Sequence, residues 1–501
     1  MLHADYSDPD VVRVSEDYFM TASSFNAAPA LPILHSQDMV NWKLVNHALP
    51  KIVPLNIFEV PQHGNGVWAP SIRFHNGEYY IYWGDPDLGI YMVKTSDPFS
   101  KWDDPILVMP GKGLIDPCPL WDDDGKVYLV HAYAGSRAGV KSLLTINQMN
   151  SSGTKVIDEG THVFDGHDGQ DTIEGPKIYK RNGYYYIFAP AGGVQYGWQL
   201  ALRSKDVYGP YEEKLVLEQG STAINGPHQG AWVESSQGQS WFYHFQDKDA
   251  YGRVLHLQPM TWKNDWPIIG TDFDGNGIGE PMLSYAKPKT EGVTRISTPA
   301  ESDFFEGFKI GLQWQWNANP EVIWHAKLPN DDFLRLFSIK PKEPRKNLWM
   351  MPNLLLQKFP APNFTATTRI SLNPEEAVSG KSAGLIVMGT DYATLTVTHD
   401  KDGFTLNQTE ATDAIDGNPE RINESIQLES NYAYLKVEVI APDAICQFRY
   451  SKDGEVYTKI GKPFKAQPGK WIGAKVGLFS VSTIESKRGG YADVDFFEIN
   501  K

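Results

Sequence analysis

The chain has 501 residues, of which 61 are acidic and 46 basic, so its formal net charge is −15 at pH 7. A chain of this length exceeds one ordinary core, and two domains are expected. The acidic balance argues against nucleic acid or an anionic membrane surface as a partner, because both need a basic face. No apolar run approaches the ~20 residues that span a bilayer.

The remaining bulk features concern the fold class and the compartment. Aromatic residues make up 12% of the chain and glycines number 44, a composition that favours β structure. Cys118 and Cys446 lie far apart, so two free buried thiols are expected. The N-terminus does not read as a signal peptide, so the protein is either cytoplasmic or secreted or periplasmic with its targeting segment removed.

From the N-terminus onward, one pattern recurs five times. Each unit has a proline at a strand entrance, a short strand, a tight turn and a second strand rich in aromatic residues. The units are spaced by roughly 50–60 residues, which suits four-stranded propeller blades. We therefore predict a five-bladed β-propeller over residues 1–285. The five entrances are Asp8-Pro9, Ala69-Pro70, Asp116-Pro117, Glu174-Gly175-Pro176 and Gly226-Pro227.

The last 200 or so residues lack this repeat. Residues 286–302 are polar and have the composition of a linker. Strand-like alternation resumes over residues 303–501, with tight turns at Asp402-Gly403 and Asp453-Gly454. This pattern predicts a second, all-β domain built as a two-sheet jelly-roll sandwich.

The five entrances also suggest a site. The first strand of each propeller blade lines the central axis, so residues at its entrance converge on one face. Asp8, Asp116 and Glu174 stand at three entrances, while Ala69 and Gly226 leave room at the other two. Each acidic motif taken alone is also an ordinary turn former. Three carboxylates in one pocket would raise at least one pKa.

Two opposed carboxylates, one neutral and one charged, are the equipment for cleaving a glycosidic bond. Glu174 has the longer side chain and is the better candidate for the general acid. Asp8 would then be the general base that activates water. Asp116 would raise the pKa of Glu174 and orient it.

With these motifs in order, the chain resembles glycoside hydrolase family 43 over nearly its whole length. The resemblance implies a five-bladed propeller, inverting hydrolysis and the same three carboxylate roles. It also implies an exo-acting enzyme that removes terminal α-L-arabinofuranosyl or β-D-xylosyl residues from plant polysaccharides. A loop of the second domain would help to close the pocket, and catalysis would need no organic cofactor. The segments that carry the resemblance are Ser7-Asp8-Pro9-Asp10, Trp68-Ala69-Pro70-Ser71-Ile72, Ile115-Asp116-Pro117, Ile173-Glu174-Gly175-Pro176 and Gly226-Pro227-His228-Gln229-Gly230.

Four further residues are candidates around the carboxylates. Phe25 and Trp68 would offer aromatic faces to a sugar, although plain packing would also explain them. Arg253 stands where the resemblance places a sugar-binding arginine; a surface salt bridge is the alternative. The resemblance also suggests that His228 faces a calcium ion or water in the central channel, whereas a lone histidine is usually structural.

Two other functions compete with the inverting glycosidase. One is a carbohydrate-binding propeller without catalysis, and the other is a retaining hydrolase of the fructan type. The sequence does not decide between arabinofuranosides and xylosides, although a pocket-shaped site favours side-chain removal, and hence arabinofuranosides, by a small margin.

Overall fold

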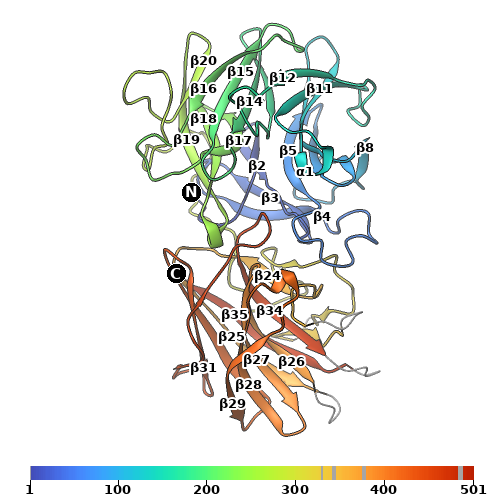
Figure 1. The fold of residues 1–501 in the computed structure, drawn as a ribbon, viewed down its shortest axis with the longest axis vertical. Coiled ribbons are helices and arrows are strands. Elements are labelled where there is room, and N and C mark those ends of the chain that lie inside the picture. Colours follow the sequence, from blue (N-terminus) through green and yellow to red (C-terminus); the bar gives the residue numbers. More distant parts are fainter. Residues whose placement is uncertain (1, 329–330, 341–345, 375–379, 483–488) are drawn as a thin grey trace.

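The computed structural model describes residues 2–328, 331–340, 346–374, 380–482 and 489–501. Figure 1 shows two lobes stacked along the long axis, with the N-terminal half of the chain in one and the C-terminal part in the other. No helix in the described ranges is long and apolar enough to cross a membrane. Both cysteines are free and buried, as predicted.

The N-terminal lobe consists of five four-stranded antiparallel sheets, each with its strands in sequence order from the inside outward. The first two blades are β1 (Asp10–Val14), β2 (Asp17–Thr21), β3 (Ala30–Ser36) and β4 (Lys43–Leu49), then β5 (Trp68–His75), β6 (Glu78–Asp85), β7 (Gly89–Thr95) and β8 (Ile106–Pro110). The third blade is β9 (Leu114–Trp121), β10 (Val127–Tyr133), β11 (Leu143–Met149) and β12 (Thr161–Asp165), with the short helix α1 (Gly135–Ala138) after β10.

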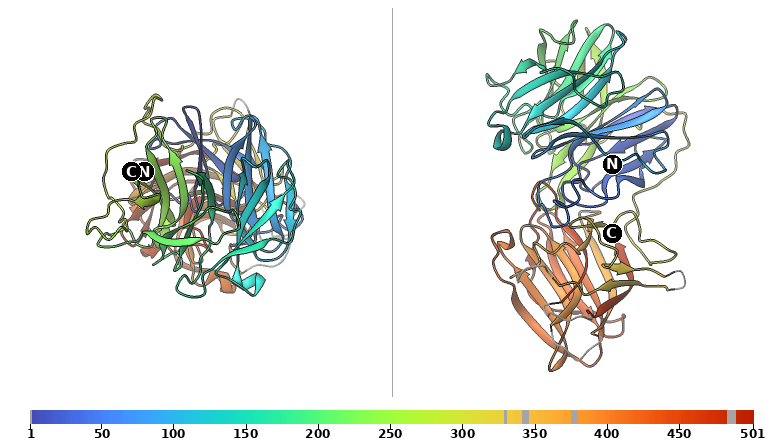
Figure 2. Two further views of the ribbon diagram at one scale, coloured as in Figure 1. Left: turned by 90° about the horizontal axis from the view of Figure 1, so that it is seen from above. Right: turned by 90° about the vertical axis from the view of Figure 1, so that its right-hand side faces the viewer.

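Two more blades complete the ring. They are β13 (Lys177–Arg181), β14 (Tyr184–Ala191), β15 (Trp198–Ser204) and β16 (Glu212–Leu217), then β17 (His228–Glu234), β18 (Ser240–Asp247), β19 (Arg253–Lys263) and β20 (Trp266–Ile269), with the 3₁₀ turn η1 (Asp249–Tyr251) before β19. Strand β1 contacts both β5 and β17, so the last blade packs against the first. The view from above in Figure 2 shows the blades arranged around a centre. The predicted five-bladed propeller is confirmed.

Local sequence explains the hairpins inside the blades. At the β5–β6 turn, Asn76 and Gly77 have φ angles of 49° and 82°. At the β13–β14 turn, Asn182 and Gly183 have φ angles of 50° and 73°. Two successive left-handed residues form the turn whose twist matches a two-residue hairpin, and Asn-Gly is the pair that best tolerates it.

Buried polar contacts tie the inner strands together below the entrances. Asp10 accepts a hydrogen bond from the backbone N–H of Ile72 at 2.8 Å and also binds Arg73. The buried ammonium of Lys177 donates to the carbonyl of Pro70 at 3.0 Å and to Ser71 Oγ at 2.9 Å. The first, second and fourth blades are thus joined directly under the site by charge-assisted hydrogen bonds, which are the stronger kind.

The C-terminal lobe is a sandwich of two antiparallel sheets around one apolar core. The seven-stranded sheet has the order β21 (Gln315–Trp316), β24 (Leu355–Lys358), β34 (Lys475–Ser482), β26 (Lys381–Met388), β27 (Tyr392–Asp400), β28 (Gly403–Ala411) and β29 (Arg421–Leu428). The eight-stranded sheet has the order β22 (His325–Ala326), β23 (Leu334–Phe337), β35 (Tyr491–Asn500), β25 (Phe364–Asn373), β30 (Tyr432–Ile440), β31 (Ile445–Ser451) and β32 (Thr458–Lys459), with β33 (Phe464–Lys465) also paired to β31. The 3₁₀ turn η2 (Ala414–Asp416) precedes β29. The predicted sandwich is confirmed, and the predicted linker lies within the segment between β20 and β21.

The two lobes are joined by specific hydrogen bonds. Asn319 exchanges two of them with the backbone of Ile52, at 2.7 and 2.8 Å. Asn26 donates to the carbonyl of Asn317 at 2.8 Å. Figure 1 shows a loop of the sandwich, coloured near the C-terminal end of the bar, rising to the propeller. This contact brings part of the second domain to the propeller face that carries the entrances.

Candidate active site

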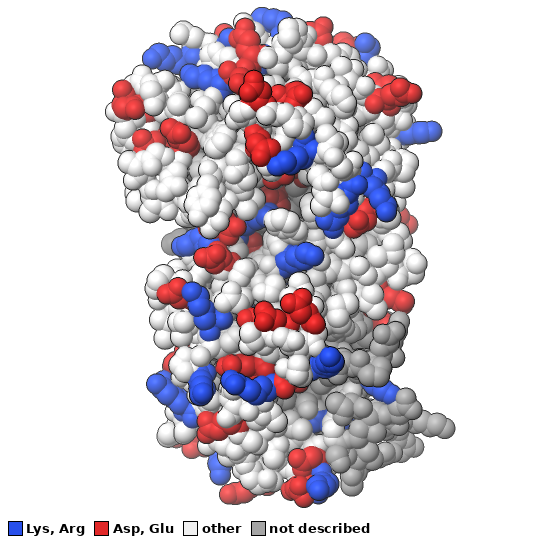
Figure 3. Space-filling view, viewed as in Figure 1, with Lys and Arg blue, Asp and Glu red and all other residues white. Residues whose placement is uncertain are grey.

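The three predicted carboxylates line one pocket at the propeller entrances. The structure therefore brings together side chains that are 58 to 166 positions apart in the sequence. Acidic and basic side chains are interspersed over the face seen in Figure 3. The pocket is lined by Asp8, Phe25, Trp68, Ala69, Ile115, Asp116, Glu174, Val194, His228, Gln229, Arg253 and Trp471.

The backbone at the entrances is held in an unusual conformation. Asp8 has a φ of 53° and Asp116 a φ of 58°, both in the left-handed region that non-glycine residues rarely occupy. Such residues cost on the order of 1–3 kcal/mol each and cluster at functional sites. Here each carboxylate lines the pocket and directly precedes a proline, Pro9 before β1 in the first blade and Pro117 inside β9 in the third.

The fourth and fifth entrances depart from the simple alignment. In the fourth blade the left-handed position is held by Gly175, with a φ of 61°, so Glu174 lies one residue earlier than Asp8 and Asp116 do. In the fifth blade Gln229, with a φ of 29°, stands at the irregularity between His228 and Gly230. The predicted fifth equivalent, Gly226, is therefore displaced by three residues, because Gly226-Pro227 belongs to the preceding loop.

Asp8 is bound by hydrogen-bond donors from two blades. Ser23 Oγ donates to its Oδ2 at 2.5 Å, and Arg253 Nη1 lies 3.2 Å from its Oδ1. Ser23 also accepts the backbone N–H of Ala69 at 2.7 Å, which fixes the hydroxyl. Because donors stabilise the charged form of a carboxylate, this arrangement suits an ionised base. Asp8 is only 4% exposed, so its free lone pairs face the pocket rather than bulk water.

Asp116 and Glu174 form the protonatable side of the pocket. Gly175 N–H donates to Asp116 Oδ2 at 2.7 Å, which links the third and fourth entrances. Burial, and next the charge of Asp8, raise the pKa of Asp116 to about 7. Burial, and next the charge of Asp116, raise the pKa of Glu174 to about 8. At neutral pH a proton therefore resides on Glu174, as a general acid requires.

The pocket wall is aromatic. Phe25 and Trp68 lie edge to face with ring centroids 6.3 Å apart, and Trp471 meets Trp68 in the same way at 6.1 Å. The Arg253 guanidinium lies 5.9 Å from the Trp471 ring. Phe25, Trp68 and Arg253 thus stand in the pocket where the sequence suggested, and Arg253 pairs with the buried Asp8 rather than with a surface carboxylate.

Trp471 comes from the loop between β33 and β34 of the sandwich, and Asp5 holds that loop against the propeller. The carboxylate of Asp5 accepts the backbone N–H groups of Arg253 and Gly473, both at 2.9 Å. A Cβ at Gly473 would lie 2.7 Å from the backbone nitrogen of Gly252, so only glycine permits this approach. A loop of the second domain therefore forms part of the pocket wall, as predicted.

His228 lies beside the acid rather than in a cluster of metal ligands. Its Nε2 is 3.6 Å from Glu174 Oε1, and neither ring nitrogen has a hydrogen-bond partner. Burial, and next the charge of Arg253, lower the pKa of His228 to about 3, so the ring is neutral. Within the described ranges no three His, Cys, Asp or Glu side chains gather to hold a metal. Because both ring nitrogens of His228 lack a hydrogen-bond partner, one of them could bind an ion or a water molecule in the central channel.

Several pocket or supporting residues were not predicted, among them Ser23, Gln229, Trp471 and Asp5. Gln229 lies inside a recognised motif, and aligning the blades by their left-handed residue would have singled it out. Trp471 and Asp5 could not be found in this way, because each acts across the domain interface and belongs to no repeat.

Three carboxylates in one aromatic pocket, two of them with raised pKa values, are typical of a glycoside hydrolase. The family model described as "Glycosyl hydrolases family 43" matches residues 1–267, and the one described as "Beta xylosidase C-terminal Concanavalin A-like domain" matches residues 302–500. The chain belongs to glycosyl hydrolase family 43, as its motifs indicated.

Curated relatives and solved structures agree with this assignment. A protein named "Putative beta-xylosidase" from Xylanibacter ruminicola is 37% identical over 96% of this chain and 86% of its own. A "Beta-xylosidase" from Formosa agariphila is 32% identical over 99% of this chain and 89% of its own. The crystal structure of a xylan beta-1,4-xylosidase from Bacillus halodurans matches with a TM-score of 0.87 and 23% identity, over 100% of this chain and 99% of its own. This match supports the fold.

Proposed function

We propose that the protein is an exo-acting, inverting glycosidase that releases terminal β-D-xylosyl and α-L-arabinofuranosyl residues from hemicellulose-derived oligosaccharides. The proposal rests on one observation: the same pocket holds Glu174, whose pKa is raised, and Asp8, which accepts hydrogen bonds from Ser23 and Arg253. A sugar-binding propeller without catalysis would have no use for a carboxyl group kept protonated at neutral pH.

The residues divide the reaction between them. Glu174 donates its proton to the glycosidic oxygen as the bond to the anomeric carbon breaks. Asp8 takes a proton from the water that attacks that carbon from the opposite face. The products are the free sugar with inverted configuration and the shortened alcohol; Asp8 then releases its proton to solvent and Glu174 regains one. Asp116 keeps the pKa of Glu174 high, and its contact with Gly175 N–H fixes the segment that carries the acid.

Exo-action follows from the shape of the pocket. Trp471 of the sandwich and Trp68 of the propeller meet edge to face in the pocket wall. A polysaccharide chain running through would need both ends of a cleft to be open. A pocket admits a chain terminus or a side branch, and buries one sugar against apolar faces.

The preferred sugar is proposed to be β-D-xylose. Two relatives above 30% identity are named "Putative beta-xylosidase" and "Beta-xylosidase", whereas a "Non-reducing end alpha-L-arabinofuranosidase" from Bacteroides ovatus is 28% identical over 77% of this chain. This reverses the small margin that pocket shape gave to arabinofuranosides. Side-by-side assay of 4-nitrophenyl β-D-xyloside and 4-nitrophenyl α-L-arabinofuranoside tests it. Higher kcat/KM on the xyloside is expected, and higher kcat/KM on the arabinofuranoside would overturn the preference.

The chemistry is proposed to need no cofactor, since acid, base and water suffice for the steps above. A structural calcium ion, if it binds at the propeller centre, would use a nitrogen of His228 as its protein ligand. Dialysis against a chelator is then expected to lower the melting temperature of the wild type and leave that of His228→Gln unchanged. Equal melting curves for the wild type with and without chelator would remove the ion from the account.

A further inference from the structure

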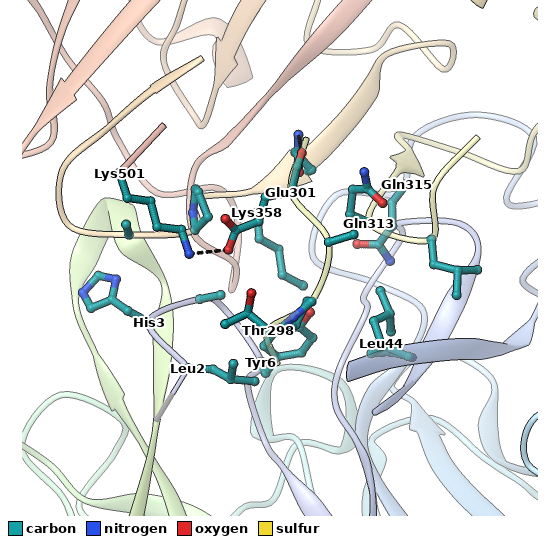
Figure 4. A pocket seen from close by; sticks show the side chains of 18 of the residues that line it. Leu2, His3, Tyr6, Leu44, Thr298, Glu301, Gln313, Gln315, Lys358 and Lys501 are labelled. Atoms are coloured by element: carbon teal, nitrogen blue, oxygen red, sulfur yellow. Dashed lines mark hydrogen bonds and ion pairs between the residues drawn. The ribbon is translucent and has the colours of Figure 1, made fainter. Parts of the chain in front are cut away.

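A second cavity, of about 270 Å³, lies at the domain interface and is lined by other residues than the catalytic pocket. Its walls come from the N-terminal segment, the first blade, the linker and the sandwich, and none of its residues lines the catalytic pocket. The volume lies near the lower end of the ~300–1,000 Å³ range of small-molecule sites. Figure 4 shows the ion pair of Lys501 with Glu301 on one side of this cavity and Gln313 with Gln315 on the other.

Lys358 gives the cavity an uncompensated positive charge. It lines the cavity, and its Nζ lies 5.2 Å from the centroid of the Tyr6 ring, another wall residue. In the part of the chain that the structure describes, no carboxylate is recorded within ion-pair distance of this ammonium. Asp5 is the carboxylate whose charge it feels, and both Asp5 oxygens already accept backbone N–H groups. Lys358 is partly buried, so water screens its charge less than it would at an exposed site.

A second ammonium adds to the positive potential. Lys475 is 6% exposed and is repelled by Lys358, and this repulsion adds to burial in lowering the pKa of Lys475 to about 7. The other titratable groups that face Lys358 are His47, which burial and Lys358 keep neutral, and the Glu301–Lys501 pair, which is balanced. An anion in the cavity would therefore remove a repulsion as well as gain an ion pair.

The remaining walls favour an anion that also carries hydroxyl groups. His47 is 8% exposed and its Nδ1 has no hydrogen-bond partner; Gln313 Oε1 and His3 Nδ1 are also buried without one. These neutral atoms can donate to or accept from hydroxyls, which a bare inorganic ion could not use fully. Tyr6 and Leu44 supply an apolar face for the carbon side of such a ligand.

We propose that this interdomain cavity is a binding site for a small sugar acid, whose carboxylate pairs with Lys358 and whose hydroxyls bind His47 and Gln313. Because its walls come from both domains and the linker, the ligand stabilises the arrangement of the lobes that brings Trp471 to the catalytic pocket. The site does not depend on which sugar the enzyme cleaves.

The test is calorimetric titration of the full chain with three matched probes: D-glucuronate, neutral D-glucose, and acetate, which has the charge without the hydroxyls. Glucuronate is expected to bind about tenfold more tightly than either of the others, a difference of ~1.4 kcal/mol. Lys358→Met is expected to lose this preference. Lys452→Met, which removes an exposed lysine of the sandwich, should keep it.

Two further measurements locate the site. Leu312→Trp narrows the cavity without touching a charge, and should weaken glucuronate binding even if Lys358→Met folds poorly. Glucuronate should not raise the KM for an aryl xyloside in the wild type, because it does not occupy the catalytic pocket. Competitive inhibition would place glucuronate in the catalytic pocket, and equal affinities for the three probes, or no binding at all, would equally overturn the proposal.

Discussion

The catalytic pocket is built from two halves that are held in place by different means. The propeller half carries Asp8, Asp116 and Glu174 at strand entrances, which neighbouring blades tie together through backbone and buried ion pairs. The sandwich half is the single side chain Trp471, 48% exposed, on a loop fastened by Asp5. The comparison indicates that the propeller half performs the chemistry, while the sandwich half determines which substrates fit the pocket.

Breaking the propeller half should have the largest effect. Glu174→Gln is expected to lower kcat by about 10²–10⁴-fold, because the leaving oxygen is no longer protonated. The loss should be greater on xylobiose than on 2,4-dinitrophenyl xyloside, whose leaving group needs little acid assistance. Steady-state kinetics on both substrates measure this.

Asp8→Asn is the matched control, since the base acts on water whatever the leaving group. Its loss, of similar size, should be equal on the two substrates. If Asp8→Asn rather than Glu174→Gln discriminated between leaving groups, the two roles would have to be exchanged.

The next largest effect concerns the pH dependence of kcat/KM, which tests the role of Asp116 in the propeller half. A general acid must be protonated, so kcat/KM falls as pH rises through the pKa of Glu174, about 8. The charge of Asp116 helps to raise that pKa. Asp116→Asn should therefore move the alkaline limb of the kcat/KM profile to lower pH, in addition to lowering the rate. An alkaline limb that stays in place would show that Asp116 does not tune the acid.

Breaking the sandwich half should change substrate binding more than turnover. An aromatic contact is worth about 0.5–1.5 kcal/mol beyond burial, so Trp471→Ala is expected to raise KM for xylobiose roughly 2- to 12-fold with kcat little changed. Trp471→Phe should restore most of the affinity. A fall in kcat as large as that of Glu174→Gln would contradict the division between the two halves.

The smallest expected effect concerns the fastening of that loop. An amide at Asp5→Asn can accept only one of the two backbone N–H groups, and leaving the other unpaired costs about 1–3 kcal/mol. The melting temperature should fall, and KM for xylobiose should rise about threefold without a shift of the pH profile. Unchanged KM despite lower stability would mean that Asp5 supports the interface but not the position of Trp471.

The two halves of the pocket also differ in how well they could be predicted from the sequence. The propeller half was predictable because a turn residue and proline before each inner strand mark the entrances, and ring closure brings equivalent positions together. The sequence shows one extra residue between Glu174 and its proline, but the cause became clear only in the structure, where Gly175 holds the left-handed position. The fifth entrance was misplaced at Gly226 because a second Gly-Pro turn precedes it.

Trp471 and Asp5 lay beyond sequence reasoning for a physical reason. Their positions depend on how two independently patterned domains dock, which repeats and strand periodicity do not encode. The sequence does place Gly473 two residues after Trp471. The reason why this position must be glycine, the close approach of the Gly252 backbone, is evident only from the structure.

The central claim is that Glu174 and Asp8 act as acid and base on opposite sides of one bond. Proton NMR of the first sugar released from 4-nitrophenyl β-D-xyloside, recorded before mutarotation, tests it most directly. Inversion gives α-D-xylose first, and the account predicts that signal. Appearance of β-D-xylose first would reveal a covalent intermediate and contradict it.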